Sequence, residues 1–236
     1  MSEWKAKRFW TEATVVPLDQ GFTVELDGRS VKTPGKALLV MPTRALAAAV
    51  AEEWQAQGEM INPMTMPTTR TANSAIDKVA VQHDEVATLL AAYGDSDLLC
   101  YRADRPVELV ARQAAAWDPL LDWGETELGA RLEPRVGVMH APQDPEALAA
   151  LARQTRALPD FELTAFHDLV SLSGSLIIGF AAARGAWPAE ELWEISRLDE
   201  LFQIEQWGRD EEAEAMAAAK RESFLHARRI FDLLAD

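Results

Sequence analysis

A histidine and an aspartate beside several serines are the residues of this chain that most resemble catalytic machinery. His167 and Asp168 are adjacent, and Ser171, Ser173 and Ser175 follow them closely. A serine hydrolase needs a nucleophilic serine, a histidine base and a carboxylate that orients the histidine. The segment lacks the first glycine of the Gly-x-Ser-x-Gly motif, and its sequence predicts the interior of a helix. A hydrolase that uses His167 and Asp168 therefore remains an alternative without a motif to support it.

Metal and cofactor sites have no matching pattern elsewhere in the sequence. None of the four histidines forms a His-Glu-x-x-His motif or another ligand pair at helical spacing. Cys100 is the only cysteine, and its apolar neighbours predict a buried, unreactive thiol. The sequence contains neither Gly-x-x-x-x-Gly-Lys-Ser/Thr nor Gly-x-Gly-x-x-Gly, the two common phosphate-binding loops. We therefore predict no metal ion and no cofactor.

Acidic residues set the charge of the chain and form a candidate docking surface. The sequence has 38 Asp and Glu against 23 Lys and Arg, a formal net charge of -15. This charge disfavours nucleic acid as a partner, because an acidic surface repels phosphate groups. Carboxylates are dense between Glu190 and Glu214, and Trp207 lies among them. The stretch is either a solvated helix face or a docking surface for a positively charged partner, with Trp207 as a helix-end packing residue or a binding anchor.

Strand patterns come first in the sequence and helix patterns later. Apolar and polar residues alternate over residues 22–26, after an apolar run at 14–16, which predicts two strands. Asp27-Gly28 is typical of a hairpin turn, since both central residues of that turn have positive φ. This order predicts an α+β fold: a small N-terminal antiparallel β-rich domain with helices, residues 1–103, followed by a larger, mainly α-helical domain, residues 104–236.

The second part of the chain is predicted to be nearly all helical. Asp144-Pro145 is typical of an N-cap followed by a proline in the first helical position. Single helices are predicted from Asp160 to near Gly185 and from Pro188 to Gly208. The longest apolar stretch, residues 169–183, is too short to cross a bilayer, so no integral membrane segment is expected.

Two segments resemble sequence blocks of the ATP12 family, the assembly factors of the F1-ATPase. They are residues 69–77, Thr-Arg-Thr-Ala-Asn-Ser-Ala-Ile-Asp, and residues 196–208, Ser-Arg-Leu-Asp-Glu-Leu-Phe-Gln-Ile-Glu-Gln-Trp-Gly. Shorter matches follow the family's order along most of the chain, at residues 8–10, 34–35, 51–54, 97–103, 163–168 and 173–175. Each block is weak alone, but the ordered set is specific.

The resemblance implies a fold, an activity and a location. The fold is a small β-rich domain joined to a larger helical one, and the activity is ATP-independent holding of the F1-ATPase α subunit until it joins the β subunit. Mitochondrial members carry a transit segment, whereas residues 8–10 already match the first block here. Residues 1–5 also lack the apolar core of a secretory signal. We therefore expect a monomeric bacterial protein in the cytoplasm, with eukaryotic relatives in the mitochondrial matrix.

The resemblance also implies two groups of partner-binding residues. The later block contributes acidic, amide and aromatic side chains, with Arg197 as a brace behind them: Asp199, Glu200, Gln203, Glu205 and Trp207. The earlier block contributes Arg70 and Asn73, for which hydrogen bonding at a domain interface is an equal alternative. An acidic scaffold for another partner remains the competing non-enzymatic hypothesis.

Overall fold

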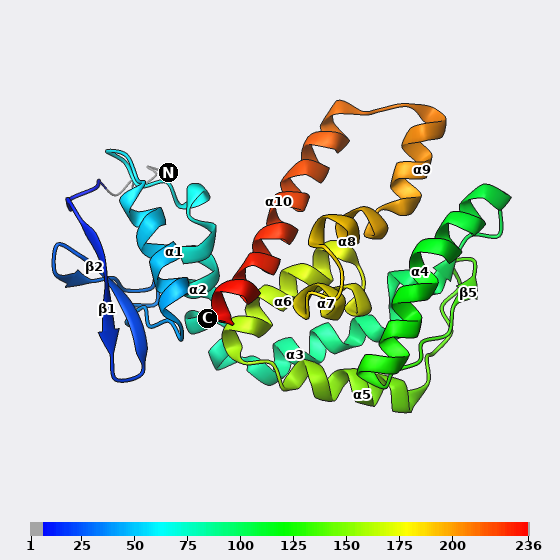
Figure 1. Ribbon diagram of the computed structural model, residues 1–236, viewed down its shortest axis with the longest axis horizontal. Helices are drawn as coiled ribbons and strands as arrows, with labels where there is room; N and C mark the ends of the chain where they lie inside the picture. The colour runs from blue at the N-terminus through cyan, green and yellow to red at the C-terminus, as the bar shows by residue number, and fades with distance from the viewer. Residues whose placement is uncertain (1–6, 236) are drawn as a thin grey trace. The chain divides into compact units, whose positions relative to one another are not determined.

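The computed structural model describes residues 7–235, and Figure 1 shows its elements coloured in chain order. Residues 1–5, for which no secretory signal is expected, lie outside this range. By internal contacts the chain forms two compact units. The β-containing unit comprises residues 1–82, 160–165 and 229–236, and the helical unit comprises residues 83–159 and 166–228. These ranges differ from the domain ranges 1–103 and 104–236, which stay a prediction.

The β-containing unit begins with a three-stranded antiparallel sheet. Its strands are β1 (Ala13–Leu18), β2 (Gly21–Leu26) and β3 (Arg29–Ser30), in the order β1-β2-β3. Asp27 and Gly28 have φ values of 48° and 79°, so the predicted hairpin turn between β2 and β3 is confirmed. Helical elements follow the sheet: α1 (Arg44–Gln55), η1 (Pro63–Thr65), α2 (Pro67–Asp77) and η2 (Val79–Val81).

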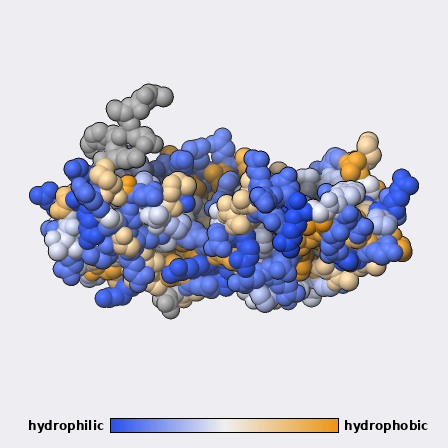
Figure 2. Space-filling view, turned by 90° about the horizontal axis from the view of Figure 1, so that it is seen from above, coloured by the Kyte–Doolittle hydropathy of each residue, from blue (hydrophilic) through white to orange (hydrophobic). Residues whose placement is uncertain are grey.

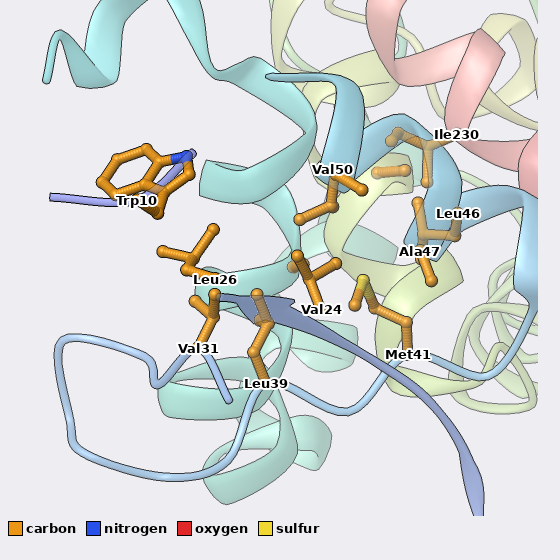
Figure 3. Close-up of a cluster of buried hydrophobic side chains, with 13 residues drawn as sticks. Trp10, Val24, Leu26, Val31, Leu39, Met41, Leu46, Ala47, Val50 and Ile230 are labelled. Carbon is orange, nitrogen blue, oxygen red and sulfur yellow. The ribbon is translucent and has the colours of Figure 1, made fainter. Parts of the chain in front are cut away.

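The core of this unit lies between the sheet and α1, which packs against β1 and β2. Figure 3 shows Val24 of β2 and Val50 of α1 gathered with Met41, from the segment before α1, and with Ile230. Ile230 comes from the last helix of the chain, and Thr43 donates a hydrogen bond of 2.6 Å to the carbonyl oxygen of Leu233 in the same helix. Residues from both ends of the sequence therefore complete one core.

The helical unit contains most of the remaining elements. Its first part holds α3 (His83–Ala91), η3 (Ala92–Ser96), η4 (Leu98–Cys100), β4 (Tyr101–Arg102), α4 (Val107–Leu128), β5 (Arg135–Val136) and α5 (Pro145–Arg156). Then follow α6 (Asp160–Ser173), α7 (Leu176–Ala183), α8 (Ala189–Ser196), α9 (Leu198–Trp207) and α10 (Glu211–Leu234). A small N-terminal sheet followed by a mainly helical remainder confirms the predicted α+β class.

The single helix predicted from Asp160 to near Gly185 is wrong, because the chain breaks at Gly174. Gly174 ends α6 with a φ of 73°, a conformation that glycine adopts without steric cost. Ser175 then begins α7, and its side chain accepts a hydrogen bond of 3.0 Å from the backbone N–H of Ile178. The small residues that were predicted to lie inside one helix instead separate two helices.

The helix predicted from Pro188 to Gly208 is also two helices. α8 ends at Ser196 and α9 begins at Leu198, with Arg197 between them at φ -109° and ψ 17°. The predicted start at Asp144 is confirmed, since its carboxylate accepts hydrogen bonds from the backbone N–H groups of Glu146 and Ala147 at the start of α5.

The predicted burial of the lone thiol is confirmed. Cys100 is 4% exposed, and burial raises the pKa of its thiol to about 12. Figure 2 shows a face of the protein on which polar side chains prevail and apolar ones form small, separate groups. Within residues 7–235, no helix combines the length and apolar composition that a membrane crossing requires.

Candidate partner-binding surface

The break at Arg197 sets the direction of α9, which carries five of the predicted site residues. The Arg197 guanidinium forms an ion pair with Glu200 at 2.7 Å and lies 5.7 Å from the centre of the Trp193 ring. Trp193 is 4% exposed, so Arg197, just before α9, packs over a buried aromatic ring of α8. These contacts suit the predicted bracing role.

One face of α9 is turned toward α4 and carries Asp199. The side-chain amide of Gln113 on α4 donates a hydrogen bond of 2.7 Å to Oδ1 of Asp199. Gln113 is 1% exposed, and its own amide oxygen accepts a hydrogen bond of 2.8 Å from the backbone N–H of Ala103. Because a buried amide without partners is costly, Asp199 satisfies a group inside the fold.

Glu205 also contacts α4, about one and two-thirds turns after Asp199. Arg112 on α4 donates to both carboxylate oxygens of Glu205, at 2.7 and 2.9 Å. Its guanidinium also lies 5.2 Å from the centre of the ring of Phe202, a buried residue of α9. The Glu205 side chain is 51% exposed, so its outer edge is open to a partner while the ion pair fixes its position.

The opposite face of α9 carries the other three predicted residues. Glu200, Gln203 and Trp207 follow at i, i+3 and i+7, which places them along one side of the helix. All three are exposed, and Trp207 is 81% exposed. An aromatic side chain that stands free beside carboxylates is typical of an interface anchor, so the binding interpretation is favoured over helix-end packing.

The second predicted group lies on α2, in the β-containing unit. Arg70 is exposed, whereas the side-chain oxygen Oδ1 of Asn73 is buried without a hydrogen-bond partner. A buried amide oxygen of this kind costs free energy unless a partner reaches it. The structure thus places the α2 residues and the α9 residues in separate compact units, and the role of both groups stays a prediction.

Comparison with known proteins supplies the family. A family model described as "ATP12 chaperone protein" matches residues 7–125. The crystal structure of Atp12 from Paracoccus denitrificans is 52% identical, covers 98% of this chain and 100% of its own, and has a TM-score of 0.95. The chain belongs to the ATP12 chaperone family. This confirms the predicted resemblance and, with it, a chaperone of F1-ATPase assembly as the general class of function.

More distant relatives agree with this ATP12-family assignment. A structure from Agrobacterium tumefaciens, described as a candidate chaperone, is 43% identical, with a TM-score of 0.93 over 98% of this chain and 87% of its own. The mitochondrial protein atp12 of Schizosaccharomyces pombe is 26% identical over 219 residues, which is 88% of this chain and 75% of the relative. The similarity therefore extends along nearly the whole chain.

Several ATP12-family blocks contact one another through partly buried carboxylates. Glu53 of the block at 51–54 accepts hydrogen bonds of 2.6 and 2.7 Å from the backbone N–H groups of Thr68 and Thr69, at the start of α2. Asp77, which ends the block at 69–77, accepts a hydrogen bond of 2.8 Å from the backbone N–H of Gly35. These contacts join helix starts and turns that are distant in sequence, so much of the family signature encodes the fold.

Asp97 is the most deeply buried of these carboxylates. It is 0% exposed and accepts hydrogen bonds of 3.0 and 3.1 Å from the backbone N–H groups of Leu99 and Ile177. It thereby joins η4 to the start of α7. Burial raises the pKa of Asp97 to about 6, although the hydrogen bonds that it accepts act in the opposite direction.

The residues of the hydrolase hypothesis form contacts within or at the ends of helices and do not form a catalytic triad. His167 and Asp168 interact with each other at 3.0 Å, and this hydrogen bond raises the pKa of His167. Ser173 donates to the carbonyl oxygen of Leu169 at 2.6 Å, and Ser175 caps α7. In the described part of the chain no hydrogen bond joins His167 to a serine, so the geometry gives the hydrolase hypothesis no support.

Three relevant residues were not found from the sequence. Arg112 and Gln113 hold α9, but they lie about ninety positions earlier, and no pattern along the chain links them to it. Met216 on α10 shares a helix face with Phe224 by its spacing, yet it is 57% exposed whereas Phe224 is buried. Spacing shows that residues share a helix face, but it does not show how far along the helix that face is covered.

Proposed function

We propose that this chain is an ATP-independent assembly chaperone that binds the F1-ATPase α subunit in the cytoplasm. It shields the surface of the α subunit that faces the β subunit and releases the α subunit when the β subunit arrives. The ATP12-family match along nearly the whole chain is the observation that carries this proposal. An exposed apolar surface on an unassembled subunit promotes aggregation, so a temporary cover has a physical purpose.

The outward face of α9 is the proposed centre of contact. Glu200, Gln203 and Trp207 are exposed along one side of the helix, where a charged rim and an aromatic anchor lie together. Asp199 and Glu205 contribute to this surface from the α4 side, mainly by fixing α9. Arg70 and Asn73 are proposed as a second contact.

Release requires that the chaperone bind the α subunit more weakly than the β subunit does. A steric competition between two proteins for one surface needs no nucleotide hydrolysis. The charged rim speeds the first encounter, whereas the apolar contacts set the lifetime of the complex. Such a chaperone must bind the α subunit tightly enough to compete with aggregation of the α subunit. It must also bind the α subunit more weakly than the β subunit does.

Co-purification with the isolated α subunit tests this proposal. We expect the purified chain to retain α subunit, to keep it soluble on warming, and to release it on addition of β subunit without ATP. Serum albumin in place of the chain controls for non-specific protection. Failure to bind α subunit while another bacterial protein is retained would favour the acidic scaffold, and turnover of an ester or peptide substrate would favour the hydrolase.

A further inference from the structure

The first half of α10 has an apolar face with no cover in the helical unit. Phe224 and Ala227 are buried, with 0% and 1% exposure. Met216 and Ala217 precede them at i-8 and i-7 from Phe224, so all four lie on the same side of the helix. Met216 is 57% exposed and Ala217 is half-buried, which leaves the N-terminal end of the stripe open.

Trp207 lies at the other end of a short connection from this stripe. Gly208 ends α9 with a φ of 94°, and Asp210 accepts a hydrogen bond of 2.8 Å from the backbone N–H of Ala213 in the first turn of α10. Figure 1 shows α9 and α10 joined by this connection, with the uncovered half of α10 adjacent to it. The α9–α10 arm, residues 198–220, thus carries the open end of the stripe, Met216 and Ala217, on one helix and an exposed indole at the end of the other.

The charge around the stripe is strongly acidic. Acidic residues outnumber basic ones seven to two between residues 198 and 220, and Lys220 is the one basic residue on the stripe itself. Glu214 pairs with Arg209 at 3.4 Å. Glu211 and Glu212 are exposed, and neither has an ion pair within residues 7–235. Such a surface attracts cationic groups that flank an apolar segment and repels anionic ones.

We infer that the α9–α10 arm binds an amphipathic helix of the client whose apolar face is bordered by Lys or Arg. The small side chain of Ala217 allows a second helix to approach closely, and the flexible Met216 side chain adapts to its surface. The arm consists of two helices and the short connection between them, so it offers no strand edge to an extended segment. That this helix belongs to the F1-ATPase α subunit rests on the proposed function.

A pair of methionine substitutions in the full chain tests the inference. Met216→Gln removes the apolar contact without adding charge and keeps a good helix former. Met64→Gln is the matched control, because Met64 is 72% exposed in the other unit. The probes are isolated α subunit, a model helical peptide with a leucine stripe bordered by lysines, and the same peptide with its sequence scrambled.

The wild-type chain should bind the striped peptide at least tenfold more tightly than the scrambled peptide. Met216→Gln should weaken both the striped peptide and the α subunit about fivefold, with an unchanged thermal midpoint, while Met64→Gln behaves as wild type. Equal binding of α subunit by wild type and Met216→Gln would overturn the inference while leaving the proposed function intact. A second outcome is that the chain binds the peptide through Met216 but does not bind the α subunit. That result would support helix binding by the α9–α10 arm and would refute the α subunit as the client.

The charge requirement has its own test. A second striped peptide, bordered by glutamates instead of lysines, should bind at least tenfold more weakly at low salt, and the difference should shrink as salt rises. Equal affinity of the two striped peptides at low salt would overturn the assignment of a basic helix as the occupant.

Discussion

The α6–α7 turn and the outward face of α9 use carboxylates in opposite ways. At the turn, the carboxylate of Asp97 and the hydroxyl of Ser175 are buried and bonded to backbone N–H groups. On α9, Glu200 and Trp207 have no such task and are exposed. Both regions lie in segments that resemble sequence blocks of the ATP12 family. A family block can therefore mark either the fold or a surface, and only the contacts of each side chain distinguish the two.

Loss of the Asp97 carboxylate should have the largest effect on stability. We expect Asp97→Ala to lower the free energy of unfolding by about 3 kcal/mol, because two buried N–H groups lose their acceptor. Urea denaturation followed by circular dichroism measures the change. Asp168→Ala is the matched control, since Asp168 is half-exposed and should change stability by less than about 0.5 kcal/mol. Similar losses of stability in the two variants would show that the buried Asp97 carboxylate contributes no more than an exposed one.

The pH dependence of stability should carry the signature of Asp97. Its pKa is raised to about 6 from 3.8, so the folded chain holds this proton more tightly than the unfolded chain. The resulting stabilisation is present below pH 4 and is lost as the pH rises through 6, a fall on the order of 3 kcal/mol. Asp97→Asn should flatten this part of the curve. Parallel curves for wild type and Asp97→Asn would contradict the prediction, because other titrating groups cancel in the difference.

Charge reversal at two neighbouring residues should distinguish the roles of the two faces of α9. Asp199→Lys should lower the free energy of unfolding by about 1 to 2 kcal/mol, because buried Gln113 loses its acceptor. Glu200→Lys should leave the thermal midpoint within about 1 °C of wild type, since it breaks only an exposed ion pair. Both should weaken binding of the α subunit. Differential scanning fluorimetry and titration with α subunit measure the two effects, and equal midpoints would mean that both residues act only at the surface.

Truncation of the exposed indole should affect binding alone. Trp207→Ala is expected to raise the Kd for the α subunit about tenfold, as for a moderate interface hot spot, with little change in thermal midpoint. Val138→Ala is the control, because Val138 is 88% exposed on a loop outside the α9–α10 arm. A fall in midpoint without loss of affinity would assign Trp207 to packing.

The smallest effect should come from Glu205. Its ion pair with Arg112 is half-exposed on both sides, so Glu205→Gln should cost only about 0.5 kcal/mol of stability. The cost should disappear in high salt, as expected for an exposed pair. A salt-independent loss of several kcal/mol would show that Glu205, like Asp97, is part of the interior.

Local signals in the sequence predicted local structure well. The Asp27-Gly28 turn and the Asp144 cap were found because the chemistry of each is contained in a few consecutive residues. The breaks at Gly174 and Arg197 were missed, since apolar spacing continues across both of them. A break that is set by packing and by hydrogen bonds to distant residues leaves little trace in helical periodicity.

The candidate site was predicted as a segment but not as a surface. Its five α9 residues divide between two faces, and the division depends on Arg112 and Gln113 from α4. No spacing rule within 196–208 shows that Asp199 is bonded inward whereas Trp207 is free. Family resemblance located the segment, while the tertiary contacts assign different tasks to its residues.

The presence of Ile230 and Leu233 in the first unit has a consequence for biosynthesis. During translation, residues 1–82 leave the ribosome long before the turn of α10 that packs against Val24 and Val50. The sheet and α1 therefore keep part of their apolar surface exposed to water until residues 229–235 have been made. A protein proposed to cover the unassembled surface of another thus has an incomplete core of its own until residues 229–235 leave the ribosome.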